Sequence, residues 1–128
     1  MSRRRILIVE DNPDLRLLVR TTFEIGEGEY DIEEAENGVD ALAAVESRKP
    51  DLIVLDVMMP GRLDGLEVCA WLKSHAEWGN IRIVMLTARG QQVDIAKGLE
   101  AGADAYLVKP FSPLKLLETV ETLLATGV

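Results

Sequence analysis

The chain has 128 residues, of which 48% are hydrophobic and 28% are charged, and its formal net charge at pH 7 is −8. This length suits a single domain with a sizeable core, and so negative a chain is a poor candidate for direct binding of nucleic acid, which needs clustered Lys and Arg. No apolar run approaches 18 residues and no signal-peptide core follows the arginines at 3–5, so neither a membrane span nor a signal peptide is predicted.

Short apolar runs alternate with helical patterns along the whole sequence. The runs predict strands over residues 6–9, 52–55, 83–86 and 105–108. A further strand is predicted over residues 30–35, where Tyr30, Ile32 and Glu34 alternate on one face. The segments between them have apolar residues at helical spacing and predict helices over residues 13–23, 38–47, 66–74, 93–101 and 113–124. Asn12-Pro13 and Ser112-Pro113 supply helix starts, and Gly102 supplies a left-handed helix end.

The apolar residues within these helices predict which faces are buried. The expected inward positions are Leu15, Leu18, Val19, Phe23, Val39, Leu42, Val45, Leu66, Cys69, Ala70, Leu114, Leu117, Val120 and Leu124. Cys69, the single cysteine, excludes an internal disulfide, is interpreted as core packing and fits a reducing cytoplasm. Strict alternation of five strands and five helices predicts one α/β domain over residues 1–128, with a parallel sheet and helices on both faces.

Polar residues stand at or just after the ends of four predicted strands. Glu10 and Asp11 follow the first, Asp56 the third, Thr87 the fourth and Lys109 the fifth. Each could have a local role alone, as a helix cap, a loop acid or a surface lysine. Because sites in open parallel sheets form outside the carboxyl ends of the strands, we expect these side chains to converge.

Three converging carboxylates predict a cation. At about 4 Å and an effective dielectric constant near 20, each pair of like charges costs about 4 kcal/mol. Oxygen ligands favour Mg²⁺, with Mn²⁺ as a substitute, and Mg²⁺ commonly engages phosphate oxygens. Acids that hold Mg²⁺, together with a lysine and a hydroxyl, are typical of phosphoryl transfer, and Asp56 is then the expected nucleophile.

Four stretches of the sequence resemble receiver domains of two-component response regulators. They read ILIVEDNPDLR, LIVLDVMMPG with DGLE after it, IVMLTA, and GADAYLVKPF, and they span nearly the whole chain. The resemblance implies a flavodoxin-like fold with strand order 2-1-3-4-5. It also implies that Asp56 is the phosphoacceptor and that Glu10, Asp11, Asp56 and the backbone carbonyl of Met58 hold Mg²⁺.

The same resemblance implies roles for residues around the phosphoacceptor. Lys109, before a cis bond to Pro110, would pair with the phosphoryl oxygens, and Thr87 would bond the attached phosphoryl group. Tyr106 would rotate inward as Thr87 moves, although an aromatic residue on a short strand is more often simple packing. Met58 and Arg89 would tune the lifetime of the acyl phosphate.

The resemblance further implies partners. The donor would be a sensor histidine kinase or a histidine phosphotransfer protein, and the chain would catalyse only its own phosphorylation and dephosphorylation. A downstream effector would bind the face formed by the fourth helix, fifth strand and fifth helix. DNA-binding dimers of this family carry an acid and an arginine that Ala105 and the segment ETVETLL lack, so we expect a monomer or weak dimer. The last predicted helix ends almost at the C-terminus, so we expect a stand-alone cytoplasmic regulator, with a receiver excised from a longer chain as the alternative.

Two departures from the family pattern and three alternatives remain at this point. Glu10 replaces a commoner aspartate, and the loop MMPGRLDGLE is one residue longer than usual.

The first alternative function, a flavodoxin-like electron carrier, would not place the acids of EDNPD beside a flavin phosphate. An aspartyl phosphatase would carry an acid where Met58 stands. A degenerate receiver that only binds partners would not need the intact site.

Overall fold

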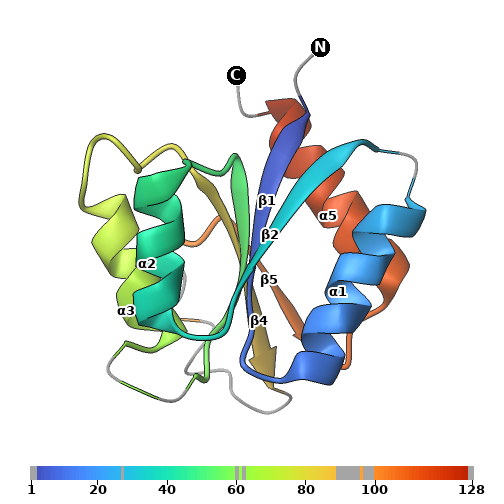
Figure 1. Cartoon of the computed structure of the whole chain (residues 1–128), viewed down its shortest axis with the longest axis horizontal. Helices are drawn as coiled ribbons and strands as arrows, with labels where there is room; N and C mark the ends of the chain where they lie inside the picture. The colour runs from blue at the N-terminus through green and yellow to red at the C-terminus, as the bar shows by residue number, and fades with distance from the viewer. Residues whose placement is uncertain are drawn as a thin grey trace.

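A computed structural model describes residues 3–26, 28–59, 61, 63–88, 96 and 100–126 of the chain. Within them lies one five-stranded sheet, in which all neighbouring strands are parallel (Figure 1). Its strands are β1 (Arg4–Val9), β2 (Tyr30–Ala35), β3 (Leu52–Asp56), β4 (Arg82–Ala88) and β5 (Ala105–Lys109). The order is β2-β1-β3-β4-β5, which confirms the predicted flavodoxin-like topology.

Helices cover both faces of the sheet, as predicted (Figure 1). One pair is α1 (Pro13–Ile25) with α5 (Pro113–Thr126), and the other is α2 (Gly38–Ser47) with α3 (Gly65–Lys73). Side chains alternate across a strand, so Ile6 and Ile8 join the core under α1 and α5, while Leu7 and Val9 join the core under α2 and α3. No helix among the described residues is long and apolar enough to cross a membrane.

The start of α1 is determined by a local cap. The Asn12 side chain accepts hydrogen bonds from the backbone N–H groups of Asp14, at 2.9 Å, and Leu15, at 3.2 Å. Pro13 occupies the first helical position, where no N–H is needed. Because the cap follows β1 so closely, Glu10 and Asp11 are confined to a short connection at the carboxyl edge of the sheet.

Four strands are longer than the apolar runs predicted: β3 and β5 by one residue at their ends, β1 at its start, and β4 at both its start and its end. β1 begins at Arg4, which pairs with Tyr30, and β4 begins at Arg82, which pairs with Leu52. Backbone hydrogen bonding continues through these charged residues because the Arg4 side chain is exposed and the Arg82 side chain pairs with Asp104 at 3.4 Å. At its other end β4 continues to Ala88, so Thr87 lies within the strand.

Some predicted inward positions were wrong. Leu18, Val39, Ala70 and Leu114 are exposed, Val39 to 50% and Leu114 to 64%. The residues that face the sheet in their neighbourhood are Val19, Ala41, Val68, Cys69 and Leu116. Where two apolar residues are neighbours in the sequence, the helical pattern does not determine which of them faces the sheet. Packing against the sheet decides which one is buried.

The region before β5 is described in part. The predicted helix over 93–101 falls mostly outside the described residues, although Ala96, Glu100 and Ala101 are helical. Gly102 has a φ of +105°, which confirms the predicted left-handed conformation. Cys69 is buried and its thiol donates to the carbonyl of Ala101 at 3.7 Å, which confirms its packing role.

Candidate metal centre at the carboxyl ends of the strands

The carboxyl edge of the sheet brings the predicted polar side chains together. Glu10 follows β1, Asp56 ends β3, Thr87 lies near the end of β4 and Lys109 ends β5. These four strands are consecutive neighbours in the sheet, so residues far apart in sequence meet within a few strand spacings.

Three carboxylates form a compact cluster at this edge. Oxygen atoms of Glu10, Asp11 and Asp56 all lie within 4.8 Å of one another. Glu10 is 1% exposed and Asp56 3% exposed, whereas Asp11 faces solvent. At this separation and an effective dielectric constant near 20, each ionised pair costs about 3 kcal/mol. The cluster therefore favours binding of a cation.

Lys109 supplies one positive charge to the cluster. Its Nζ lies 3.1 Å from Asp56 Oδ2 and 3.4 Å from Glu10 Oε1. One ammonium cannot balance three carboxylates, so negative charge remains when all three are ionised. The Lys109–Pro110 bond is cis, as predicted.

The surroundings of Glu10 in this cluster shift the pKa of its carboxyl group. Burial, with a smaller contribution from the Asp56 carboxylate, raises the pKa of Glu10 from 4.5 to about 7. The backbone N–H of Asn12, which donates to Glu10 Oε2 at 3.1 Å, and the charge of Lys109 act in the opposite direction. Without a cation, Glu10 is therefore protonated at a pH where free glutamate is ionised.

Two buried oxygens at the site have no hydrogen-bond partner in the described part of the chain. They are Glu10 Oε1 and Thr87 Oγ1. Buried polar atoms in proteins are normally hydrogen-bonded, so these two fit a site that gains a bound species. The cluster contains only oxygen ligands, which suits a hard divalent cation such as Mg²⁺.

The turn after Asp56 holds this carboxylate in place. The backbone N–H of Met58 donates to Asp56 Oδ1 at 3.2 Å, and that of Gly65 donates to the carbonyl of Val57 at 3.0 Å. A Cβ at Gly65 would lie 2.1 Å from the Asp56 carbonyl oxygen, so only glycine permits this approach. Gly65 was not singled out from the sequence, although the Asp64-Gly65 pair after the strand was a usable signal.

The two predicted switch residues differ in exposure. Thr87 is 1% exposed, whereas Tyr106 on the neighbouring strand is 42% exposed. Met58 is 59% exposed, and Arg89 lies outside the described residues. The structure places Thr87 and Tyr106 on the adjacent strands β4 and β5, and their coupled movement remains a prediction.

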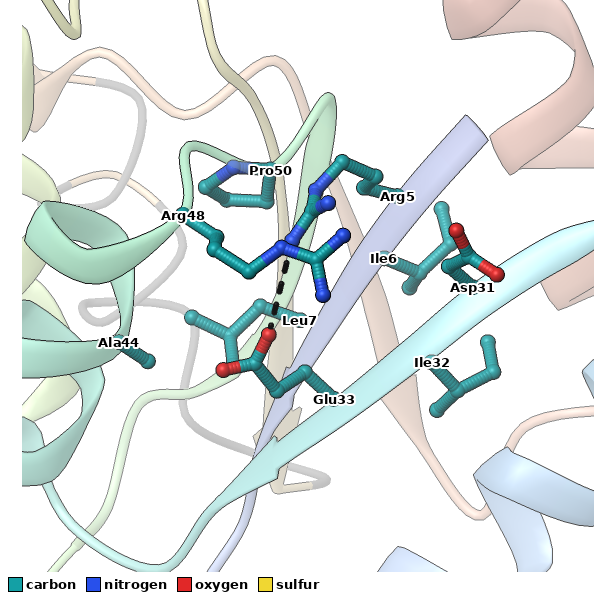
Figure 2. Close-up of a pocket in the computed structure, with 9 residues that line it drawn as sticks. All are labelled: Arg5, Ile6, Leu7, Asp31, Ile32, Glu33, Ala44, Arg48 and Pro50. Carbon is teal, nitrogen blue, oxygen red and sulfur yellow. Dashed lines mark ion pairs between the residues drawn. The ribbon is translucent and has the colours of Figure 1, made fainter. Parts of the chain in front are cut away.

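A small hollow elsewhere on the molecule does not belong to this site. It has a volume of about 50 Å³ and is lined by Arg5, Glu33 and Arg48, among others, near the start of β1 (Figure 2). Arg5 and Glu33 form an ion pair there at 3.8 Å. This hollow lies at the end of β1 opposite to Glu10, so it takes no part in the acidic cluster.

Comparison with known proteins identifies the family. The family model for the response regulator receiver domain matches residues 6–121. The chain belongs to the response regulator receiver domains. Members of this family are phosphorylation-activated switches of two-component systems and use a divalent metal, in agreement with the acidic cluster.

Curated relatives of this receiver domain are longer proteins. The chain is 42% identical over 118 residues to the DNA-binding response regulator MtrA of Mycolicibacterium smegmatis, covering 92% of this chain and 49% of that protein. It is 44% identical over 120 residues to the transcriptional regulatory protein ResD of Bacillus subtilis, covering 94% of this chain and 48% of ResD. The chain thus spans about half the length of these relatives.

Solved receiver structures match over nearly their full length. The Francisella response regulator 1452 receiver domain superposes with a TM-score of 0.86 at 30% identity, covering 98% of this chain and 99% of that one. The chemotaxis protein CheY4 of Vibrio cholerae superposes with a TM-score of 0.85 at 30% identity, covering 95% and 99%. These likenesses confirm the fold predicted for the receiver domain.

Proposed function

We propose that Asp56 accepts a phosphoryl group from a phosphohistidine donor in the presence of Mg²⁺ and that the modification changes the binding of a partner protein. The observation that supports this most directly is the setting of the Asp56 carboxylate. It ends β3, is buried, lies 3.1 Å from the Lys109 ammonium, and shares a cluster within 4.8 Å with Glu10 and Asp11.

The proposed transfer is a single displacement at phosphorus. A carboxylate oxygen of Asp56 attacks the phosphorus atom, the bond from phosphorus to the donor imidazole nitrogen breaks, and its electron pair stays on the imidazole. Lys109 then pairs with the phosphoryl oxygens. Mg²⁺, or Mn²⁺ in its place, held by Glu10, Asp11, Asp56 and the Met58 carbonyl, would neutralise the charge on those oxygens.

We further propose that the domain removes this group itself, by attack of water on phosphorus, which regenerates the Asp56 carboxylate and releases inorganic phosphate. The receiver domain then catalyses its own phosphorylation and dephosphorylation without acting on other substrates. An aspartyl phosphatase would turn over many esters and would need a general acid two residues after the nucleophile. Met58 stands there and has no titratable group.

The proposed switch is a two-state equilibrium biased by phosphorylation. Thr87 Oγ1, which has no hydrogen-bond partner among the described residues, would donate to a phosphoryl oxygen. Movement of Thr87 would leave space into which the exposed ring of Tyr106 rotates. The surface formed by β5, α5 and the helix predicted over residues 93–101 would thereby change its affinity for an effector.

The proposed donor is a sensor histidine kinase or a histidine phosphotransfer protein. A hollow of about 560 Å³ lies next to Lys109 and is lined partly by Leu15, Leu18 and Phe111. An apolar surface beside the phosphoacceptor suits a protein donor, because the transfer requires close docking. For this domain itself we propose protein partners in the cytoplasm, without direct nucleic-acid binding, and a monomer or weak dimer, in keeping with the charge of −8.

Intact-protein mass spectrometry tests the proposal. The protein is incubated with acetyl phosphate, with and without Mg²⁺, as wild type, Asp56→Asn and the control Asp31→Asn, which changes an exposed aspartate on β2. We expect one labile phosphoryl group that requires Mg²⁺, is lost in Asp56→Asn and persists in Asp31→Asn. If supplying a phosphohistidine donor as well produced no modification of Asp56, the proposal would be wrong.

A further inference from the structure

Arg16 links the metal centre to the edge of the sheet. Its side chain is 15% exposed, and each of its guanidinium nitrogens has a different neighbour. Nη1 donates to the Glu10 carbonyl oxygen at 2.8 Å, Nε donates to Glu34 Oε1 at 2.9 Å, and Nη2 lies 3.6 Å from Glu36 Oε1. The guanidinium therefore joins the connection after β1 to the end of β2 and to the residue that follows it.

We propose that Arg16 is a positioning residue for the metal centre, acting through the backbone of Glu10. This inference rests on the proposed function to the extent that a cation binds at Glu10, Asp11 and Asp56. Arg16 would touch neither the metal nor the phosphoryl group; it holds in place the carbonyl of Glu10, the residue whose carboxylate would bind the metal.

The contacts of Glu10 explain why its backbone needs this support. Its N–H donates to the carbonyl of Ala35, the last residue of β2, at 3.1 Å, and its own carbonyl accepts from Arg16. One carboxylate oxygen accepts from the Asn12 N–H, while the other has no hydrogen-bond partner in the described residues. Loss of Arg16 would free the peptide between Glu10 and Asp11, which carries both metal ligands.

Arginine suits this position for geometric reasons. Side chains of a helix lean toward its N-terminus, so Arg16 reaches back over the first turn of α1 to Glu10. The planar guanidinium directs its donors along fixed, different directions and can serve a carbonyl and carboxylates together. Lysine keeps the charge but has a single nitrogen, so it cannot reproduce the three contacts.

Charge and position predict opposite effects on cation binding. Arg16 adds positive charge near the acidic cluster, so its removal would strengthen Mg²⁺ binding if charge alone mattered. If positioning matters, loss of the contact weakens Mg²⁺ binding. Arg16→Lys separates the two effects, because it retains the charge and disrupts the geometry.

Arg20 provides a matched control on the same helix. It forms an ion pair with Glu34 and another with Glu24 at 3.5 Å, but it has no contact with Glu10 among the described residues. Arg20→Lys therefore perturbs the same carboxylate of β2 without touching the metal-binding connection.

The first measurement is the Kd for Mg²⁺ by isothermal titration calorimetry on unphosphorylated protein. Residues that orient metal ligands typically contribute 10- to 100-fold to affinity, and we expect Arg16→Lys to bind Mg²⁺ about 10-fold more weakly. Arg20→Lys should keep the wild-type Kd. At saturating Mg²⁺ the phosphorylation rate of Arg16→Lys should recover. An unchanged or tighter Kd in Arg16→Lys, or an equal loss in Arg20→Lys, would overturn the inference.

The second measurement needs no metal. Amide hydrogen exchange in EDTA should be faster at Glu10 and Asp11 in Arg16→Lys, and unchanged there in Arg20→Lys. Glu34→Gln, which weakens the anchor of the guanidinium, should show the same effect to a smaller extent. If wild type bound no Mg²⁺, the proposed metal site would fail, yet this exchange would still decide the positioning role; equal exchange in all variants would refute it.

Discussion

The buried Glu10 predicts a specific dependence of stability on pH and Mg²⁺. Burial raises its pKa from 4.5 to about 7, so between these pH values the folded protein holds a proton that the unfolded chain has released. The free energy of unfolding in metal-free protein should therefore fall as pH rises through this window. The contribution of protonated Glu10 to the free energy of unfolding is fully present below pH 4.5 and is lost above about pH 7.

The size of this effect follows from the pKa. Each pKa unit corresponds to about 1.4 kcal/mol, so the rise from 4.5 to about 7 corresponds to about 3 kcal/mol. Mg²⁺ requires the ionised carboxylate and therefore competes with the proton. Free Mg²⁺ at 100 times its Kd stabilises a protein by about 2.7 kcal/mol, which would offset most of the loss at pH 8.

The free energy of unfolding can be measured by urea unfolding, followed by the fluorescence of Trp71 and Trp78. The measurement is made at pH 5 and pH 8, in EDTA and in Mg²⁺. Glu10→Gln imitates the protonated side chain, so in EDTA it should be more stable than wild type at pH 8 by up to about 3 kcal/mol and similar at pH 5. It should also lose the Mg²⁺ effect. Glu46→Gln, which changes an exposed glutamate of α2, should behave as wild type. The same pH dependence in wild type and Glu10→Gln would refute the reasoning.

Three further predictions concern the surroundings of Asp56. Lys109→Met should slow phosphorylation by acetyl phosphate roughly 100-fold, measured by mass spectrometry over time, because it removes the cation beside the acceptor; a wild-type rate would contradict its role. Thr87→Val should raise the free energy of unfolding by about 1 kcal/mol, since it removes a buried hydroxyl that has no hydrogen-bond partner among the described residues. It should also abolish the effect of phosphorylation on partner affinity. A lower free energy of unfolding would argue that the hydroxyl is hydrogen-bonded. Gly65→Ala should lower the free energy of unfolding, measured by thermal unfolding, by about 3 kcal/mol, because the alanine Cβ would clash with the Asp56 carbonyl oxygen. A change below about 0.5 kcal/mol would show that the turn can move.

Local sequence patterns were sufficient for most of the fold. Apolar runs located four strands, the alternation around Tyr30 and Ile32 located β2, and the Asn12-Pro13 start placed α1 correctly. They were less informative at the ends of elements, where Arg4 and Arg82 joined strands through backbone hydrogen bonds that do not depend on side-chain polarity. They also misplaced Val39 and Leu114, since neighbouring apolar residues made two rotations of each helix equally plausible.

The sequence by itself determined which chemical groups lie at the carboxyl ends of the strands, because the residue that ends each apolar run is readable directly. Only the tertiary structure decided how those groups interact. The burial that raises the pKa of Glu10, the 3.1 Å contact from Lys109 to Asp56, and the 2.9 Å hydrogen bond from Arg16 to Glu34 all join residues from separate elements. Distances and burial of this kind arise when the sheet and helices pack together, and no local spacing along the chain encodes them.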